Sequence, residues 1–66
     1  MKVTIQFLKK EREIEMKEGS TIADALKKIE INPETVIVNR GGEIVTDSEK
    51  LKSGEKIEAI RIVSGG

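Results

Sequence analysis

Only one segment of this sequence has the residue spacing of an amphipathic helix. Thr21, followed three residues later by Asp24, forms the pattern of a capping box and marks the start of that helix. The apolar stripe of the helix consists of Ile22, Ala25, Leu26 and Ile29, which stand at positions i, i+3, i+4 and i+7. A helix this short is not stable by itself in water, so its apolar stripe must pack against a sheet.

The segments on either side of the helix alternate apolar and polar residues, as half-buried strands do. We predict strands over residues 2–8, 13–17, 35–39, 43–45 and 56–63. A charged connection over residues 9–13 should join the first two, and Gly41–Gly42 should form a hairpin turn. Asn32–Pro33 should end the helix, because the residue before a proline disfavours the helical region. The last strand is the most apolar, so we place it at the centre of the sheet.

The order strand, strand, helix, strand, short strand, strand predicts an α+β fold with a single mixed sheet. It fits a β-grasp roll, in which one helix crosses the sheet and the first and last strands run parallel. A ferredoxin-like fold would need a second helix, and the polar segment 46–53 is too short to supply it. We therefore expect one domain over residues 1–66, with residues 64–66 as a flexible tail.

The composition excludes several classes of function. The sequence has 12 basic and 12 acidic residues, so it lacks the basic excess that binding to nucleic acid requires. It has no cysteine and no histidine, which removes thiolate nucleophiles, imidazole bases and Cys/His metal sites. No apolar run is long enough to span a membrane. We expect a cytoplasmic monomer, and the richness in Lys, Glu and Ile is typical of thermophilic proteins.

The final pair, Gly65–Gly66, is the feature that most resembles a reactive site. Glycine has no Cβ, so an extended glycine tail can enter a channel too narrow for side chains and present its carboxylate. An ionised carboxylate is a poor electrophile, and this chain has no phosphate-binding loop that could activate it. The chain is then the substrate of another enzyme. The plain alternative is a frayed terminus, and Gly41–Gly42 shows that a glycine pair can simply serve a turn.

Three stretches carry a resemblance to a known family. They are G-S-T-I-A-D-A-L (19–26), V-I-V-N-R-G-G-E-I-V (36–45) and L-K-S-G-E-K-I-E-A-I-R-I-V-S-G-G (51–66). The whole chain resembles the ubiquitin-like sulfur carriers of the ThiS and MoaD type and the archaeal ubiquitin-like small modifiers. MoaD-type carriers usually have prolines before their glycines, whereas I-R-I-V-S (60–64) stands here, so the sequence looks more like the thiazole type.

The resemblance implies a function, a site and partners. A ubiquitin-activating-type adenylyltransferase that uses ATP and Mg²⁺ would adenylate Gly66, and sulfur transfer would yield a thiocarboxylate. Among the residues of this chain, only Gly65 and Gly66 match the functional positions of the family. A sulfur donor and a downstream acceptor enzyme would be further partners, in thiazole synthesis, tRNA thiolation or a related pathway. The chain itself would bind no cofactor and catalyse no reaction.

Strand alternation also predicts a partner-binding surface. If Val36 and Val38 point toward the helix, Ile37 points outward. If Ile57 and Ala59 point inward, the isoleucines on the outer face include Ile60 and Ile62. An exposed apolar patch near the tail would be a docking site for the activating enzyme. A register slip of one residue would reverse this assignment and bury these side chains.

Two other functions remain as alternatives to the sulfur carrier. The first is a protein modifier, joined through Gly66 to lysines of target proteins. The second is a β-grasp module that only mediates interactions, such as a TGS-like domain. A hydrolytic carboxylate pair at Glu13/Glu15 or Glu55/Glu58 is disfavoured, because so small a domain offers no cleft to perturb the pKa values.

Overall fold

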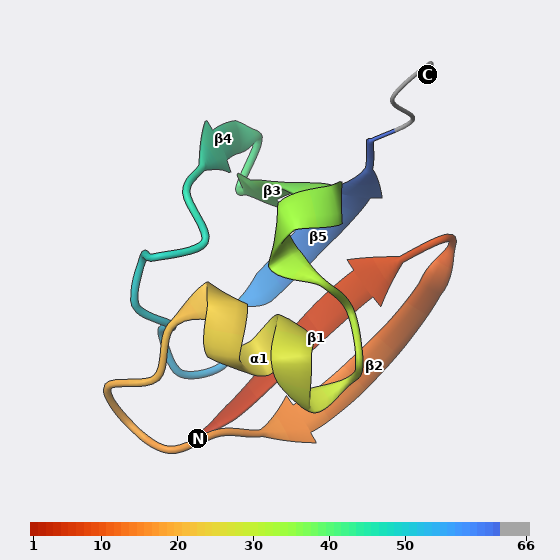
Figure 1. The fold of residues 1–66 in the computed structure, drawn as a ribbon. Helices are drawn as coiled ribbons and strands as arrows, with labels where there is room; N and C mark the ends of the chain where they lie inside the picture. Colours follow the sequence, from red (N-terminus) through yellow and green to blue (C-terminus); the bar gives the residue numbers. More distant parts are fainter. Residues whose placement is uncertain (63–66) are drawn as a thin grey trace.

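The computed structural model describes residues 1–62, which form one sheet and one α-helix (Figure 1). The elements are β1 (Lys2–Phe7), β2 (Lys10–Glu15), α1 (Ile22–Lys28), the 3-10 helix η1 (Pro33–Thr35), β3 (Val36–Arg40), β4 (Glu43–Val45) and β5 (Lys56–Arg61). The strand order is β2-β1-β5-β3-β4, with β1 parallel to β5 and the other pairs antiparallel. The predicted β-grasp topology, including the central position of the last strand, is confirmed.

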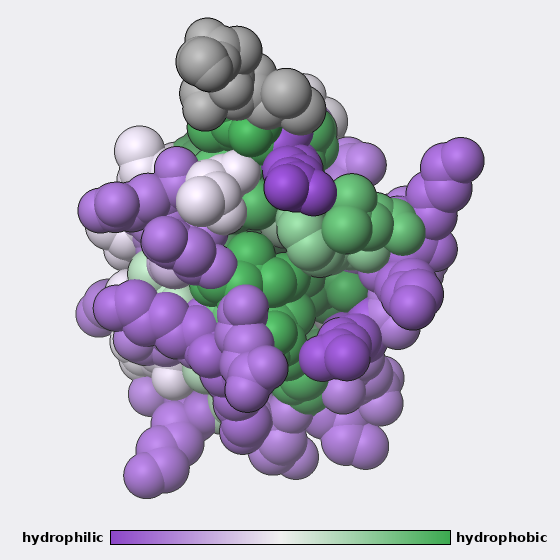
Figure 2. All heavy atoms as spheres, turned by 45° about the vertical axis from the view of Figure 1, so that its right-hand side comes forward, coloured by the Kyte–Doolittle hydropathy of each residue, from purple (hydrophilic) through white to green (hydrophobic). Residues whose placement is uncertain are grey.

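Helix α1 packs on the inner face of the sheet and encloses an aliphatic core. Ile22, Leu26 and Ile57 are completely buried, and each stabilises the fold by about 2 kcal/mol. The buried residues are Val3, Ile5, Met16, Ile22, Ala25, Leu26, Val36, Val38, Leu51, Ile57 and Ala59. The cover is incomplete, because Phe7 and Ile31 pack against this core and stay partly exposed. Figure 2 shows a strip of hydrophobic side chains that reaches the surface between hydrophilic ones.

The capping box of α1 is present as predicted. The Thr21 hydroxyl accepts a hydrogen bond from the Asp24 N–H at 3.2 Å, and the Asp24 carboxylate accepts one from the Thr21 N–H at 3.0 Å. The bond from the Thr21 N–H favours the ionised carboxylate, and together with the Thr21 hydroxyl it holds the pKa of Asp24 below its ordinary value.

The predicted end of the helix at Asn32–Pro33 is wrong, because α1 ends at Lys28. Glu30 has a φ of 63°. The N–H of Ile31 donates to the Leu26 carbonyl, and the N–H of Glu30 donates to the Lys27 carbonyl. This is a Schellman motif, which ends a helix through a left-handed residue and needs no proline.

The charged connection predicted over residues 9–13 is also wrong. Leu8 and Lys9, with φ of 51° and 65°, form a turn between β1 and β2, and residues 10–13 belong to β2. Both φ values are positive, as in the hairpin turns that match the strand twist and usually contain asparagine and glycine. Leu-Lys does not carry that signal, so the sequence pattern of these charged residues indicates a loop where the structure has a hairpin.

The entry into β3 differs slightly from the prediction. η1 occupies residues 33–35, so β3 begins at Val36, one residue later than expected. The Asn32 side chain caps η1 by accepting a hydrogen bond from the Glu34 N–H at 3.0 Å. Strand β5 ends at Arg61, so Ile62 lies just outside the strand that was predicted to include it, and Val63 lies outside the described residues.

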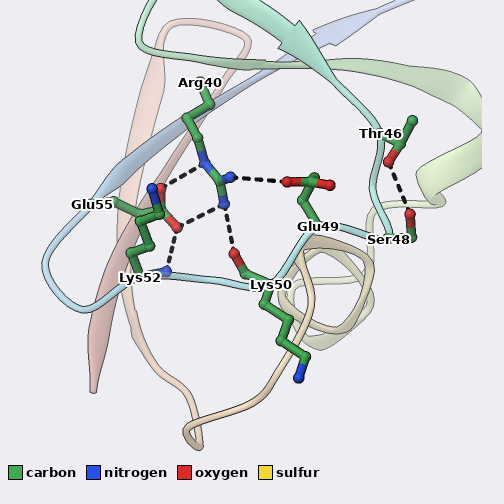
Figure 3. Close-up of polar contacts among 7 residues, drawn as sticks. All are labelled: Arg40, Thr46, Ser48, Glu49, Lys50, Lys52 and Glu55. Carbon is green, nitrogen blue, oxygen red and sulfur yellow. Dashed lines mark hydrogen bonds and ion pairs between the residues drawn. The ribbon is translucent and has the colours of Figure 1, made fainter.

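Arg40, at the end of β3, ties the loop between β4 and β5 to the sheet (Figure 3). Its guanidinium donates to the Glu55 carboxylate at 2.9 and 3.2 Å and to the Lys50 carbonyl at 2.7 Å, and it pairs with Glu49 at 3.5 Å. The same loop is bonded to the start of α1, where Ile22 donates to the Glu49 carbonyl at 2.9 Å. Arg40 therefore fixes a segment that has no strand or helix of its own.

Candidate docking surface and activated terminus

The outer face of the sheet carries an apolar patch formed by the isoleucines of β3, β4 and β5. Ile37 and Ile60 stand directly opposite each other in the β3–β5 ladder, and Ile62 follows β5. These three side chains are between 36% and 44% exposed. The predicted outward facing of Ile37 and Ile60 is confirmed, because β3 and β5 keep their alternation without a bulge. Ile62 is exposed as well.

The backbone at the end of β5 is held in place. The N–H of Ile62 donates to the Thr35 carbonyl at 2.9 Å, which ties the last described residue to η1. The Thr35 hydroxyl donates in turn to the Asn32 carbonyl at 2.8 Å. The backbone up to Ile62 is thus fixed beside the patch.

Ile44 is a member of the patch that the sequence analysis did not single out. It is 73% exposed, and its register partner Asn39 lies on the same outer face of β3 as Ile37. The signal was available in the sequence, since Val45, its neighbour in the short strand β4, is the apolar residue that packs on the core. The name "isoleucine patch" is used below for Ile37, Ile44, Ile60 and Ile62.

The other half of the outer face is charged. Three glutamates of β2 each pair with a cation: Glu11 with Lys56 at 3.0 Å, Glu13 with Lys2 at 3.9 Å, and Glu15 with the Met1 ammonium at 2.8 Å. The ammonium donates to Glu15 and lies close to it, which holds the pKa of this carboxyl below its ordinary value. The isoleucine patch is therefore confined to the part of the outer face formed by β3, β4 and the end of β5.

The predicted reactive residues, Gly65 and Gly66, lie outside the residues that the structure describes. Within residues 1–62 there is no group of three or more Cys, His, Asp or Glu side chains that could hold a metal ion. In the same part of the chain, no helix has the length and apolar character needed to cross a membrane.

Comparison with known proteins places this chain in a family. The ThiS family model matches residues 3–66. The sulfur carrier protein TtuB of Thermus thermophilus is 30% identical over 66 residues, covering all of both chains. An uncharacterized protein of Archaeoglobus fulgidus is 35% identical over 69 residues, again covering all of both chains.

Solved structures show the same fold. The ubiquitin of Caldiarchaeum subterraneum superposes with a TM-score of 0.75 at 22% identity, covering 100% of this chain and 98% of that one. A putative molybdopterin converting factor, subunit 1, of Pyrococcus furiosus also gives a TM-score of 0.75 at 22% identity, covering 94% of this chain and 98% of the other. The fold is thus a ubiquitin-like β-grasp, and with the family model matching residues 3–66, the chain belongs to the ThiS family.

Proposed function

We propose that this protein is a sulfur carrier, itself without catalytic activity, whose terminal carboxyl group is converted to a thiocarboxylate by partner enzymes. The observation that carries the proposal is the family match, which extends from residue 3 through Gly65 and Gly66. The similarity to a sulfur carrier over the full length of both chains supports it. Since the sequence has no cysteine, the sulfur comes from a separate donor.

The chemistry proceeds in two steps on the Gly66 carboxylate. One carboxylate oxygen attacks the α-phosphorus of ATP on the activating enzyme, where Mg²⁺ assists, and pyrophosphate leaves. A hydrosulfide ion delivered by the sulfur donor then attacks the carbonyl carbon, AMP leaves, and loss of a proton gives the thiocarboxylate. Two glycines suit this sequence because an extended tail without side chains can enter a narrow active site.

We further propose that the isoleucine patch docks the activating enzyme. The patch is apolar, exposed and bounded on the β1–β2 side by paired charges. Apolar surface of this kind, rimmed by polar residues, is typical of protein interfaces. It lies on the half of the sheet where β5 ends, so an enzyme seated on it would be close to the tail.

The proposal is tested with the activating enzyme of the same organism and labelled ATP. The full chain should support ATP–pyrophosphate exchange, and deletion of Gly66 should abolish it. A matched control is Lys52→Ala in the exposed loop before β5, which should leave the exchange unchanged. Exchange that persists after the deletion would contradict activation at Gly66.

Intact-mass analysis of the protein from its native host tests what happens after activation. A carrier should show a fraction in which one terminal oxygen is replaced by sulfur, and this fraction should disappear when Gly66 is deleted. A protein modifier would instead accumulate as isopeptide conjugates on lysines. Conjugates without any thiocarboxylate would overturn the carrier assignment and favour the modifier.

A further inference from the structure

A hollow of about 330 Å³ lies on the inner side of the sheet, away from the isoleucine patch. Its apolar lining comes from the end of β1 and its turn and from the segment after α1: Ile5, Phe7, Leu8, Ile29 and Ile31. The charged side chains around it are Lys10, Arg12 and Glu30. Figure 2 views the molecule with this side forward and shows hydrophobic surface bordered by hydrophilic side chains.

The charges of β2 are sorted by face, and this sorting leaves the hollow basic. The glutamates at positions 11, 13 and 15 point to the outer face, where each has a cationic partner. Lys10 and Arg12 lie on the inner face, opposite Phe7 and Ile5 in the β1–β2 ladder. Within residues 1–62 neither takes part in an ion pair or a side-chain hydrogen bond. Among the described residues that line the hollow, Glu30 is the one with a negative charge, so the rim has an excess of positive charge.

Leu8 adds apolar surface at the mouth of the hollow. It is 60% exposed and occupies a left-handed turn position, where a leucine costs about 1–2 kcal/mol compared with glycine. Leu8 is therefore unfavourable both for its turn and for its exposure, and it offers apolar surface to a partner at this place.

We propose that this hollow binds an extended, acidic segment of a partner protein, with a branched apolar side chain in the hollow and carboxylates on Lys10 and Arg12. β2 is an edge strand of the sheet, so its outward backbone groups can pair with an added strand. In such a strand alternate side chains point the same way, which brings apolar and acidic groups to the hollow together. None of the lining residues belongs to the isoleucine patch, and the proposal is independent of the sulfur-carrier chemistry.

The probe is the synthetic peptide acetyl-Asp-Glu-Ile-Val-Ile-Asp-Glu-amide, titrated into the isotopically labelled full chain and followed by amide chemical shifts. At about 1 mM peptide we expect saturable shifts at residues 7–12 and 29–31, a concentration suited to weak, transient docking. A twin peptide with lysine in place of every acidic residue should cause none. Salt at about 1 M should weaken binding, because it screens exposed charges.

Two charge-reversal variants test the assignment. Lys10→Glu combined with Arg12→Glu should weaken the peptide by about tenfold or more. Lys17→Glu combined with Lys52→Glu changes the net charge equally at exposed positions outside the hollow and should leave the affinity within about twofold. Thermal unfolding is measured on both variants to check that each is folded.

Several outcomes would overturn the proposal. These are no saturable shifts with the acidic peptide, shifts centred on Ile37 and Ile60, or equal weakening by both double variants. Shifts at the hollow that grow with protein concentration in the absence of peptide would instead assign the face to a second copy of this chain. Pyrophosphate exchange measured on Lys10→Glu/Arg12→Glu should stay unchanged, so a failure here is distinguishable from a failure of the proposed function.

Discussion

The β1–β2 and β3–β4 hairpins lie on opposite sides of the central strand β5. They differ in the side chains of their outer faces and in the residues of their turns. The outer face of β1–β2 is charged and ion-paired, whereas that of β3–β4 is apolar and exposed. The β3–β4 turn uses Gly41–Gly42 for its positive φ angles, while the β1–β2 turn imposes similar angles on Leu8 and Lys9. Each hairpin therefore contains apolar side chains at exposed positions where other residues would be more stable. In β3–β4 these are the exposed isoleucines, and in β1–β2 it is Leu8 of the turn.

The largest expected effect is on the free energy of unfolding, when Arg40 no longer ties the loop between β4 and β5 to the sheet. Arg40→Ala should lower the free energy of unfolding by about 2 kcal/mol, because it leaves the Glu55 carboxylate, which is only 13% exposed, without its cation. Lys56→Ala, at the start of β5, removes the exposed pair with Glu11 of the other hairpin and should cost at most about 0.5 kcal/mol. Urea denaturation measures both, and equal losses would contradict the distinction between the two pairs.

The next effect compares how substitutions on the β3–β5 part and on the β1 part of the outer face change the rate of activation. Ile37→Asp and Ile60→Asp should each leave the domain folded, with a loss of about 1 kcal/mol, and should lower the rate of activation by about tenfold. Gln6→Asp introduces the same side chain on the outer face of β1 and should leave activation unchanged. Thermal unfolding and pyrophosphate exchange are measured on all three. An unfolded Ile37→Asp protein would mean that this residue is required by the core.

A smaller effect is expected from exchanging the turn residues. Leu8→Asn combined with Lys9→Gly should raise the free energy of unfolding by about 1 kcal/mol, since these residues adopt positive φ angles more readily. The same variant should bind the acidic peptide more weakly, because it loses the Leu8 side chain at the hollow. A variant that is no more stable would show that Leu8 and Lys9 stabilise the native turn in another way.

The smallest effect is a pH dependence located in β2. The folded pKa of Glu15 is lowered by the Met1 ammonium, so Glu15 stabilises the folded state above its unfolded pKa. This contribution is lost as the pH falls through the lower, folded pKa. The stability difference between the wild type and Glu15→Gln should therefore be constant near neutral pH and should shrink on the acid side. A difference that is the same across the whole acid range would exclude the ion pair as its cause.

The order of the elements could be predicted because each strand and the helix has its own apolar period. The facing of Ile37 and Ile60 follows from the same period, since nothing interrupts it within β3 and β5. The proposed roles of Gly65 and Gly66 come from the family resemblance and not from the apolar period. Alternation says which face a side chain lies on, and nothing about what binds there.

The features that could not be predicted depend on backbone angles or on distant partners. Leu8, Lys9 and Glu30 adopt left-handed angles that are usual for glycine or asparagine, so the sequence carries no sign of the turn or of the helix end. Arg40 and Glu55 are 15 residues apart and meet only when β3 has paired with β5. The hollow beside α1 likewise exists only after the helix has packed on the sheet.

The parallel pairing of β1 and β5 has a mechanical consequence. If the molecule is pulled by its two ends, the force acts along these neighbouring strands in opposite directions and loads their hydrogen bonds together, in shear, instead of one after another. A force-driven unfolding machine that engages one end would meet this resistance at its first step. Single-molecule extension between the two ends should therefore require a markedly higher force than extension between the ends of the β3–β4 hairpin, whose antiparallel bonds open in succession.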